Sequence, residues 1–222
     1  MKTFAIFYEA KRVAKIGTKA KKLPEGVEQL PDGTYRGTRY NGDEITYALD
    51  PELKHLHRID GPAFEDDEWK QWRVNGQLHR IDGPANESKN LKEWWVNGKL
   101  HRIGGPAVVG PYDMKQWYVN GKRHRIDGPA FESKHYKQWY VNGKQHRTDG
   151  PAVESKNNKE WWVNGKRHRI DGPAFESKHY KQWWVDDKQF TEDDYNHLIK
   201  RLSTLTDDSD KEATIAAATM FD

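Results

Sequence analysis

The stretch His124-Arg-Ile-Asp-Gly-Pro-Ala-Phe-Glu-Ser-Lys-His-Tyr-Lys-Gln-Trp139 decides the fold, because it recurs letter for letter at residues 168–183. Its first seven residues occur six times in identical or nearly identical form, at intervals of 22 or 23 residues. The six copies begin at His57, His79, His101, His124, His146 and His168. A fixed period of this length is typical of repeat proteins, in which each small unit contacts only its neighbours along the chain.

Each repeat is predicted to contribute one β-hairpin. In residues 124–145, two extended segments, Pro129–Ser133 and Tyr136–Val141, are rich in aromatic and β-branched residues. The Asn-Gly dipeptide at 142–143 is a strong turn signal, because both residues tolerate a positive φ. Gly and Pro in every repeat interrupt any long helix. We therefore expect an all-β repeat fold, a single-layer twisted antiparallel sheet of stacked hairpins.

The repeats are expected to have a cap at each end. The N-terminal cap, the six repeats and the C-terminal cap span residues 1–56, 57–189 and 190–222. The N-terminal part contains an expected strand at Thr3–Tyr8 and a Lys-rich segment at 11–22. Thr191, three residues before Asp194, predicts the start of a short helix that covers the edge of the last hairpin. The acidic, alanine-rich residues 205–222 are expected to be disordered or to dock on another molecule.

Alternation along the second extended segment predicts two aromatic series on opposite faces of the sheet. The first series is one invariant tryptophan per repeat, expected to pack adjacent hairpins together: Trp72, Trp94, Trp117, Trp139, Trp161 and Trp183. The next position varies and is the candidate partner-binding surface: Arg73, Trp95, Tyr118, Tyr140, Trp162 and Trp184. Tyr and Trp suit such a surface because they offer a large contact area and lose little rotamer entropy. Packing under the terminal segments or against a second copy is the alternative.

The second half of a repeat, Tyr136-x-Gln-x-Tyr140-x-Asn-Gly-Lys-x-His146, resembles the Tyr-x-Gly-x-Trp-x-Asn-Gly-Lys-x-His-Gly core of MORN repeats. The segment Tyr35-x-Gly-x-Arg-x-Asn-Gly42 resembles a degenerate copy. The chain departs from the MORN pattern where Arg replaces the Gly after His and where Asp-Gly-Pro-Ala is added. Arrays of this type that end in a Trp-Val-Asp segment and a short helix are similar to MORN-like proteins of tailed bacteriophages. The resemblance implies a scaffold of hairpins and, for a phage protein, an accessory or counter-defence factor that binds and inhibits a host protein.

The loops between Asn-Gly and Gly-Pro carry candidate anion-binding residues. These are Arg58, Arg80, Arg102, Arg125, Arg147 and Arg169. A row of guanidinium groups with interleaved aromatic rings is a pattern used by single-strand nucleic-acid binders. A nucleic-acid-binding protein, or a sponge for nucleotide signals with repeated sites, is therefore the alternative function. Most of these arginines precede an Asp by two residues, which favours instead a structural Arg–Asp ladder between repeats.

Composition and repetition argue against several other classes. The chain has no Cys, so it offers no disulfide or thiolate metal site. Histidines recurring once per repeat lie about 10 Å apart, too far to share a metal ion. An active site is one asymmetric constellation, whereas every candidate group here recurs in equivalent surroundings. No apolar run approaches the roughly 20 residues that a membrane span needs.

The charge is divided unevenly along the chain, whose total is +3. Residues 57–189 carry a net charge of +6 and residues 190–222 a net charge of −5. An excess of about one positive charge per repeat gives only a weak attraction for polyanions. The sequence therefore predicts a non-enzymatic binding protein of the cytoplasm, or of the host-cell cytoplasm if phage-encoded, without cofactor or metal. Its expected partner is a host protein or a second copy, so the protein is predicted to be a monomer or a homodimer.

Overall fold

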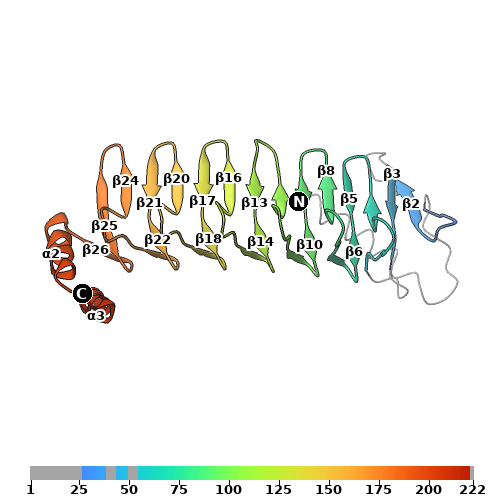
Figure 1. The fold of residues 1–222 in the computed structure, drawn as a ribbon. Helices are drawn as coiled ribbons and strands as arrows, with labels where there is room; N and C mark the ends of the chain where they lie inside the picture. The colour runs from blue at the N-terminus through green and yellow to red at the C-terminus, as the bar shows by residue number, and fades with distance from the viewer. Residues whose placement is uncertain (1–26, 39–43, 50–54, 221–222) are drawn as a thin grey trace. The chain divides into compact units, whose positions relative to one another are not determined.

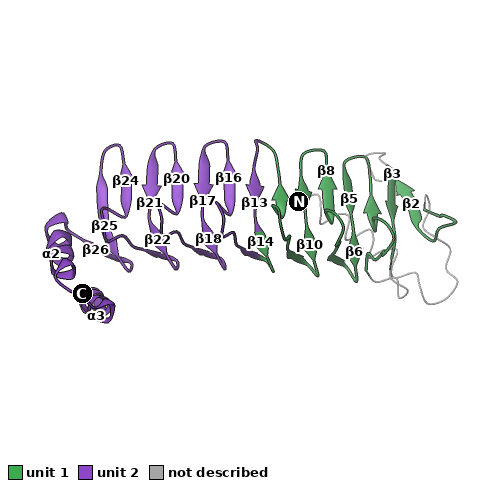
Figure 2. Cartoon of the chain, in the orientation of Figure 1, with its two compact units in different colours: residues 1–111, 118–121 green, residues 112–117, 122–222 purple. Residues whose placement is uncertain are grey.

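The computed structural model describes residues 27–38, 44–49 and 55–220, and the chain divides into two compact units (Figure 2). The first unit comprises Met1–Pro111 and Tyr118–Gly121, and the second comprises Tyr112–Trp117 and Lys122–Asp222. Sixteen of the described strands belong to an antiparallel main sheet, and most of the others form small two-stranded hairpins. Two helices follow at the C-terminal end. The expected all-β repeat fold is confirmed.

The first unit contains eight main-sheet strands in the order β1-β2-β3-β4-β5-β8-β9-β12 (Figure 1). Their bounds are β1 Glu28–Gln29, β2 Tyr35–Thr38, β3 Glu44–Tyr47, β4 Phe64–Glu65, β5 Trp69–Gln71, β8 Asn86–Ser88, β9 Lys92–Glu93 and β12 Val108–Val109. Its other strands, outside the main sheet, are β6 Arg73–Val74, β7 Gln77–Leu78, β10 Trp95–Val96, β11 Lys99–Leu100 and β14 Tyr118–Val119. The buried core of this unit gathers Ile45, Tyr47, Leu56, Ala63 and Phe64.

The second unit contains the main-sheet strands β13-β16-β17-β20-β21-β24-β25-β26, in that order. Their bounds are β13 Lys115–Gln116, β16 Phe131–Ser133, β17 Tyr136–Gln138, β20 Val153–Ser155, β21 Asn158–Glu160, β24 Phe175–Ser177, β25 Lys181–Val185 and β26 Lys188–Phe190. Its other strands, outside the main sheet, are β15 Lys122–Arg123, β18 Tyr140–Val141, β19 Lys144–Gln145, β22 Trp162–Val163 and β23 Lys166–Arg167.

A repeat contains two hairpins rather than the single hairpin that the sequence predicts. In residues 124–145, β16 and β17 form the main-sheet hairpin, and β18 and β19 form a small hairpin around the Asn-Gly turn. The predicted strand Tyr136–Val141 is interrupted at Trp139. Here the backbone changes partner, because the N–H of Trp139 donates to the carbonyl of Ala152 in the next repeat (2.8 Å), whereas its own carbonyl accepts from the N–H of His146 (3.2 Å).

The last repeat shows why the interruption occurs. No further repeat follows it to pair with Trp183, and β25 continues through this residue without a break. From Trp183 to Val185 this strand pairs with β26, with Trp183 opposite Phe190 and Val185 opposite Lys188. The break therefore depends on a following repeat, which the residues of a single repeat do not reveal.

The two C-terminal helices are α2 (Glu192–Ser203) and α3 (Asp208–Met220). Thr191 is the N-cap of α2, and its hydroxyl accepts a hydrogen bond from the N–H of Asp194, as the sequence predicts. The helix buries Tyr195, Leu198 and Leu202 together with Val185 of β25. The expectation that this acidic segment is disordered is corrected for the described residues 205–220, because α3 packs its Ile215 and Ala218 against this same cluster.

Several expectations fall outside the described residues. These are the strand at Thr3–Tyr8, the Lys-rich segment at 11–22 and the Asn-Gly pair at 41–42. The first part of the degenerate repeat is described, and there β2 pairs with β3 in an antiparallel hairpin. Within the described ranges, neither helix combines the length and the apolar character needed to cross a membrane.

Candidate binding surface

The arginines of the repeats lie in loops that join each small hairpin to the next main-sheet strand. We call the six-residue segment His-Arg-x-x-Gly-Pro the His-Arg loop. From the second loop onward, the guanidinium group stacks on the invariant tryptophan of the preceding repeat, with 3.8–4.1 Å between Cζ and the ring centroid. The pairs are Arg80 with Trp72, Arg102 with Trp94, Arg125 with Trp117, Arg147 with Trp139 and Arg169 with Trp161. This cation–π contact links consecutive repeats.

The same guanidinium group is also held by hydrogen bonds. Arg147 donates from Nε to Asp149 Oδ1 (2.8 Å), and from Nη1 to the carbonyl of Pro151 (3.1 Å) and to Glu154 Oε1 (2.8 Å). The hydrogen bond from Arg147 is the main cause that holds the pKa of the Asp149 carboxyl below its usual value. The expected Arg–Asp ladder between repeats is corrected, because the Arg–Asp pairs of the repeats lie within one loop and, from the second loop onward, the arginine reaches the neighbouring repeat through the tryptophan ring. Arg58 of the first loop also pairs with Asp32, which precedes the repeats (3.4 Å).

The position of the arginine accounts for the glycine of the motif, and burial accounts for the alanine. A Cβ atom on Gly150 would lie only 2.9 Å from Cζ of Arg147, so a larger residue displaces the guanidinium group. The alanine two residues later is fully buried in all six repeats, at 0 % exposure. These alanines are Ala63, Ala85, Ala107, Ala130, Ala152 and Ala174. The motif is therefore a packing unit as well as a turn.

Each histidine fixes the Asn-Gly turn of its own repeat. The backbone N–H of Asn164 donates to Nδ1 of His146 (3.1 Å), and the first four repeats have the same hydrogen bond. In the last repeat an aspartate replaces the asparagine, and Nδ1 of His168 lies 2.9 Å from Asp186 Oδ1. Because Nδ1 is used by the turn, these histidines have a structural role in all six repeats. No group of three potential metal-ligating side chains occurs among the described residues.

The outer surface of the His-Arg loops presents carboxylates rather than guanidinium groups. The paired arginine side chains are only 18–24 % exposed, whereas their aspartate partners are 79–85 % exposed. The third loop has Gly104 in place of the aspartate, but Arg102 still stacks on Trp94 and donates to the carbonyl of Pro106 (3.0 Å). All six candidate anion-binding arginines thus lie in equivalent loops, and their donors are directed largely into the fold.

An exposed isoleucine lies between the arginine and the aspartate, and the sequence reasoning missed it. In the first unit Ile59, Ile81 and Ile103 are 84, 85 and 75 % exposed, and in the second unit Ile126 and Ile170 are 85 and 49 % exposed. The fifth repeat has Thr148 at this position. The available signal was an apolar residue recurring inside a polar, Gly-containing loop, where no strand or helix buries it.

The candidate aromatic series is only partly accessible. All six of its members are half-buried, and several are held by neighbouring polar groups. Trp95 donates from Nε1 to Glu93 Oε2 and Trp162 donates to Glu160 Oε2, both over 3.2 Å. The guanidinium group of Arg123 lies 5.5 Å from the ring of Tyr140.

Arg73 and Trp184 of this series have comparable surroundings. Arg73 donates to Gln71 Oε1 (3.0 Å) and to the carbonyl of Gly76 (2.7 Å), and burial lowers its pKa. The guanidinium group of Arg167 lies 5.5 Å from the ring of Trp184. The series, most of which lies in the small hairpins, therefore makes local contacts and is only partly exposed.

One face of the main sheet carries alternating Glu and Lys residues, which we call the Glu-Lys row. In the second unit seven consecutive strands contribute Lys115, Glu132, Lys137, Glu154, Lys159, Glu176 and Lys181, each directly opposite the next. The first unit has the same arrangement from Glu65 to Lys92. Opposite charges on neighbouring strands stabilise the pairing and leave a neutral, solvated face. The sequence reasoning did not identify this row.

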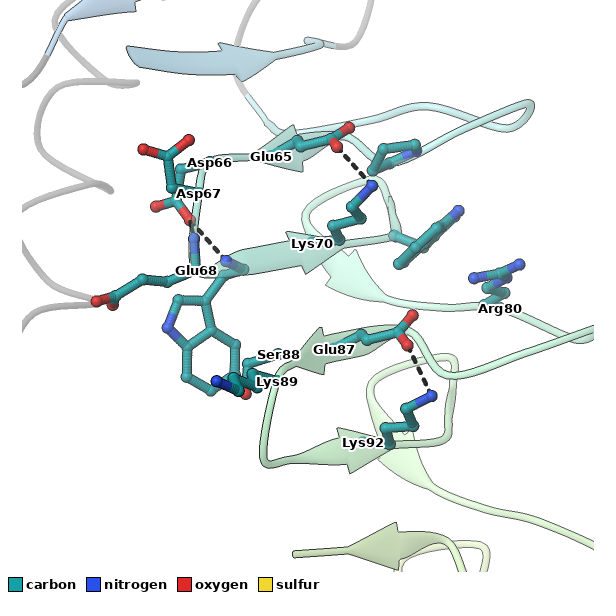
Figure 3. Close-up of a pocket in the computed structure, with 13 residues that line it drawn as sticks. Glu65, Asp66, Asp67, Glu68, Lys70, Arg80, Glu87, Ser88, Lys89 and Lys92 are labelled. Carbon is teal, nitrogen blue, oxygen red and sulfur yellow. Dashed lines mark hydrogen bonds and ion pairs between the residues drawn. The ribbon is translucent and has the colours of Figure 1, made fainter. Parts of the chain in front are cut away.

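A hollow of about 670 Å³ lies between the main-sheet hairpins β4-β5 and β8-β9 (Figure 3). Its lysines Lys70 and Lys92 form ion pairs with Glu65 (2.6 Å) and Glu87 (3.0 Å) of the adjacent strands. Asp66 Oδ1 accepts hydrogen bonds from the N–H groups of the hairpin turn. These contacts make the hollow a feature of the Glu-Lys row and assign it no chemistry of its own.

Comparison with known proteins adds no relationship: no protein-family model, no curated protein and no solved structure matches this chain.

Proposed function

We propose that this protein is a non-enzymatic protein-binding repeat protein whose His-Arg loops form the contact surface. The observation that carries this proposal is the exposed isoleucine of these loops. Covering one such side chain on association is worth about 1.5–3 kcal/mol if it becomes fully buried. A single exposed isoleucine on a soluble protein needs no explanation, but the same exposed position in five of six repeats does.

The loops are suited to binding because they are rigid. Every loop is held by the buried alanine that follows it and by the hydrogen bonds of its arginine and histidine, and from the second loop onward the Arg–Trp stack is added. A surface that is already ordered loses little conformational entropy when a partner covers it. The half-buried aromatic series offers less free area and is therefore the weaker candidate surface.

The charge of the loops favours a protein over a nucleic acid. A nucleic-acid surface directs Lys and Arg donors toward phosphates. Here the aspartates are exposed and the arginines are committed to the fold, so a phosphate backbone would meet carboxylates first. A protein partner with apolar and basic groups fits this surface better. Under the phage resemblance that partner is a host protein.

The test compares capture by three forms of the tagged protein from bacterial lysate, with nuclease present and at about 150 mM salt. These forms are the wild type, an Ile59→Ser, Ile81→Ser, Ile103→Ser variant and a Tyr140→Ala, Trp162→Ala variant. The proposal requires that a partner protein is captured in stoichiometric amount despite the nuclease, and that only the isoleucine variant fails to capture it. A partner lost only with the aromatic variant moves the contact surface to the aromatic face. Nucleic acid as the sole companion, released by salt, refutes the proposal.

A further inference from the structure

The exposed isoleucines of one unit form a row with a defined period. Ile59, Ile81 and Ile103 occupy the same loop position in consecutive repeats of the first unit, and the Arg–Trp stacks hold the second and third of these loops. Each repeat adds two strands to the main sheet. With about 4.7–4.9 Å between strands, equivalent residues recur about every 9.4–9.8 Å.

This period discriminates between the conformations of a bound chain. A polyproline II helix rises 3.1 Å per residue with three residues per turn, so it presents the same face about every 9.3 Å. An α-helix returns to nearly the same face after seven residues, which is about 10.5 Å. Over the two intervals between the first and the third loop, the length of two such helical repeats differs from the loop spacing by roughly 1.4–2.2 Å for the α-helix and by roughly 0.2–1.0 Å for the polyproline II helix. An extended strand turns every third residue to the opposite face, so it reaches only every second loop.

The aspartates beside this row of isoleucines indicate which charged side chains a bound segment should carry next to its apolar residues. Asp60 and Asp82 follow Ile59 and Ile81 directly, and each uses Oδ1 to accept a hydrogen bond from its own arginine. Both carboxylates are 82 % exposed, so their outer oxygens face the medium next to the isoleucines. A bound segment that places a Lys or Arg beside each apolar residue complements this surface.

We infer that the row Ile59, Ile81 and Ile103 binds a basic polyproline II segment of a protein partner, with one three-residue turn per loop. This inference rests on the proposed function and specifies its partner. Each triplet of the segment supplies one apolar residue to an isoleucine, one basic residue to an aspartate where the loop has one, and one residue, such as proline, that maintains the conformation. The third loop has Gly104 and makes only the apolar contact.

The probe is a synthetic peptide of six Pro-Val-Lys triplets, tested by fluorescence anisotropy against the full-length protein at about 150 mM salt. A control peptide has the same composition and length, but its Val and Lys residues are reordered so that neither recurs every third position. A second control is a helical peptide with Leu and Lys at heptad spacing. The protein variants are the triple Ile→Ser form at positions 59, 81 and 103, and the Asp60→Asn, Asp82→Asn form.

The expected result is at least about tenfold tighter binding of the triplet peptide than of the reordered peptide. The triple isoleucine variant should lose this preference, and the aspartate variant should reduce it. Equal binding of the two peptides shows attraction by charge alone and overturns the inference, as does tighter binding of the helical peptide. A captured partner that needs the isoleucines but contains no apolar-basic triplets also overturns it, while the proposed function stands. A partner indifferent to the isoleucines refutes the proposed function itself.

Discussion

The inner and outer sides of the His-Arg loop are built on different principles. On the inner side an arginine stacks on a tryptophan, a Cβ atom on the glycine would lie 2.9 Å from that guanidinium group, and the alanine that follows the loop has no exposed surface. The outer side carries an isoleucine and an aspartate that are almost fully exposed in most repeats. Both sides recur in the sequence with similar regularity. Repetition of a residue therefore does not distinguish a packing residue from a surface residue, whereas burial does.

The largest expected effect is on the inner side, at Trp139. Trp139→Ala removes the ring under Arg147 and leaves a gap between two repeats, so we expect a loss of about 2–4 kcal/mol in the free energy of unfolding. Urea denaturation followed by circular dichroism measures it. The matched control is Tyr140→Ala, at the next position, where a half-buried ring on the other face should cost about 1 kcal/mol. Equal losses for the two variants would contradict the assignment of Trp139 as the packing residue.

A smaller effect is expected at Gly150, where an added methyl group meets the guanidinium group of Arg147 at 2.9 Å. The arginine must leave part of its stack or its hydrogen bonds, so Gly150→Ala should cost about 1–2 kcal/mol. The same substitution in an Arg147→Ala background should cost much less, because the opposing group is absent. Thermal unfolding of the four proteins of this double-mutant cycle gives the coupling energy. An unchanged cost without the arginine would locate the constraint in the backbone instead.

The fold was largely predictable because its signals are local and repeated. The period, the Asn-Gly turns and the invariant tryptophans predict antiparallel hairpins that pack through Trp139 and its equivalents. The second hairpin was not predicted, because the break at Trp139 depends on a hydrogen bond to Ala152 in the next repeat. The stacking of Arg147 on this tryptophan was missed for the same reason, since the two residues meet across a repeat boundary.

The candidate site was less predictable than the fold. Sequence spacing identifies Arg147 and Asp149 as partners but does not show which of the two side chains faces the solvent. Aromatic residues such as Tyr140 are typical of binding surfaces, but here the ring is half-buried and lies beside the guanidinium group of Arg123. The exposure of Ile126, by contrast, was not predicted, because apolar residues usually pack inside a protein.

Acid should weaken the contact between the two sides of the loop. The hydrogen bond from its arginine is the main cause that lowers the pKa of the carboxyl in Asp82, Asp127 and Asp149 from the usual 3.8. A pKa that is lower in the folded state contributes stability above the unfolded value, and this contribution is lost as the pH falls through the folded value. We therefore expect the melting temperature to decrease once the pH drops below about 3.8.

The variant that tests the acid effect is Asp82→Asn, Asp127→Asn, Asp149→Asn. These three carboxyls no longer titrate in it, so its melting temperature should change less between pH 5 and pH 3 than that of the wild type. The comparison is best made by calorimetry at low salt, because exposed charges are screened. If both proteins lose stability in parallel, the acid sensitivity does not arise from these three carboxyls.

The smallest effect on stability belongs to the outer side, at Ile126. Ile126→Ser exchanges an exposed side chain that has lost little of its contact with water, so the free energy of unfolding should change by less than about 0.5 kcal/mol. The reverse exchange, Thr148→Ile, extends the row of isoleucines in the second unit and should be equally neutral for folding. For binding, the two changes should act in opposite directions, weakening and strengthening capture of the same partner. A substantial loss of stability in Ile126→Ser would show that the isoleucine packs after all, and would remove the observation from which the binding surface was inferred.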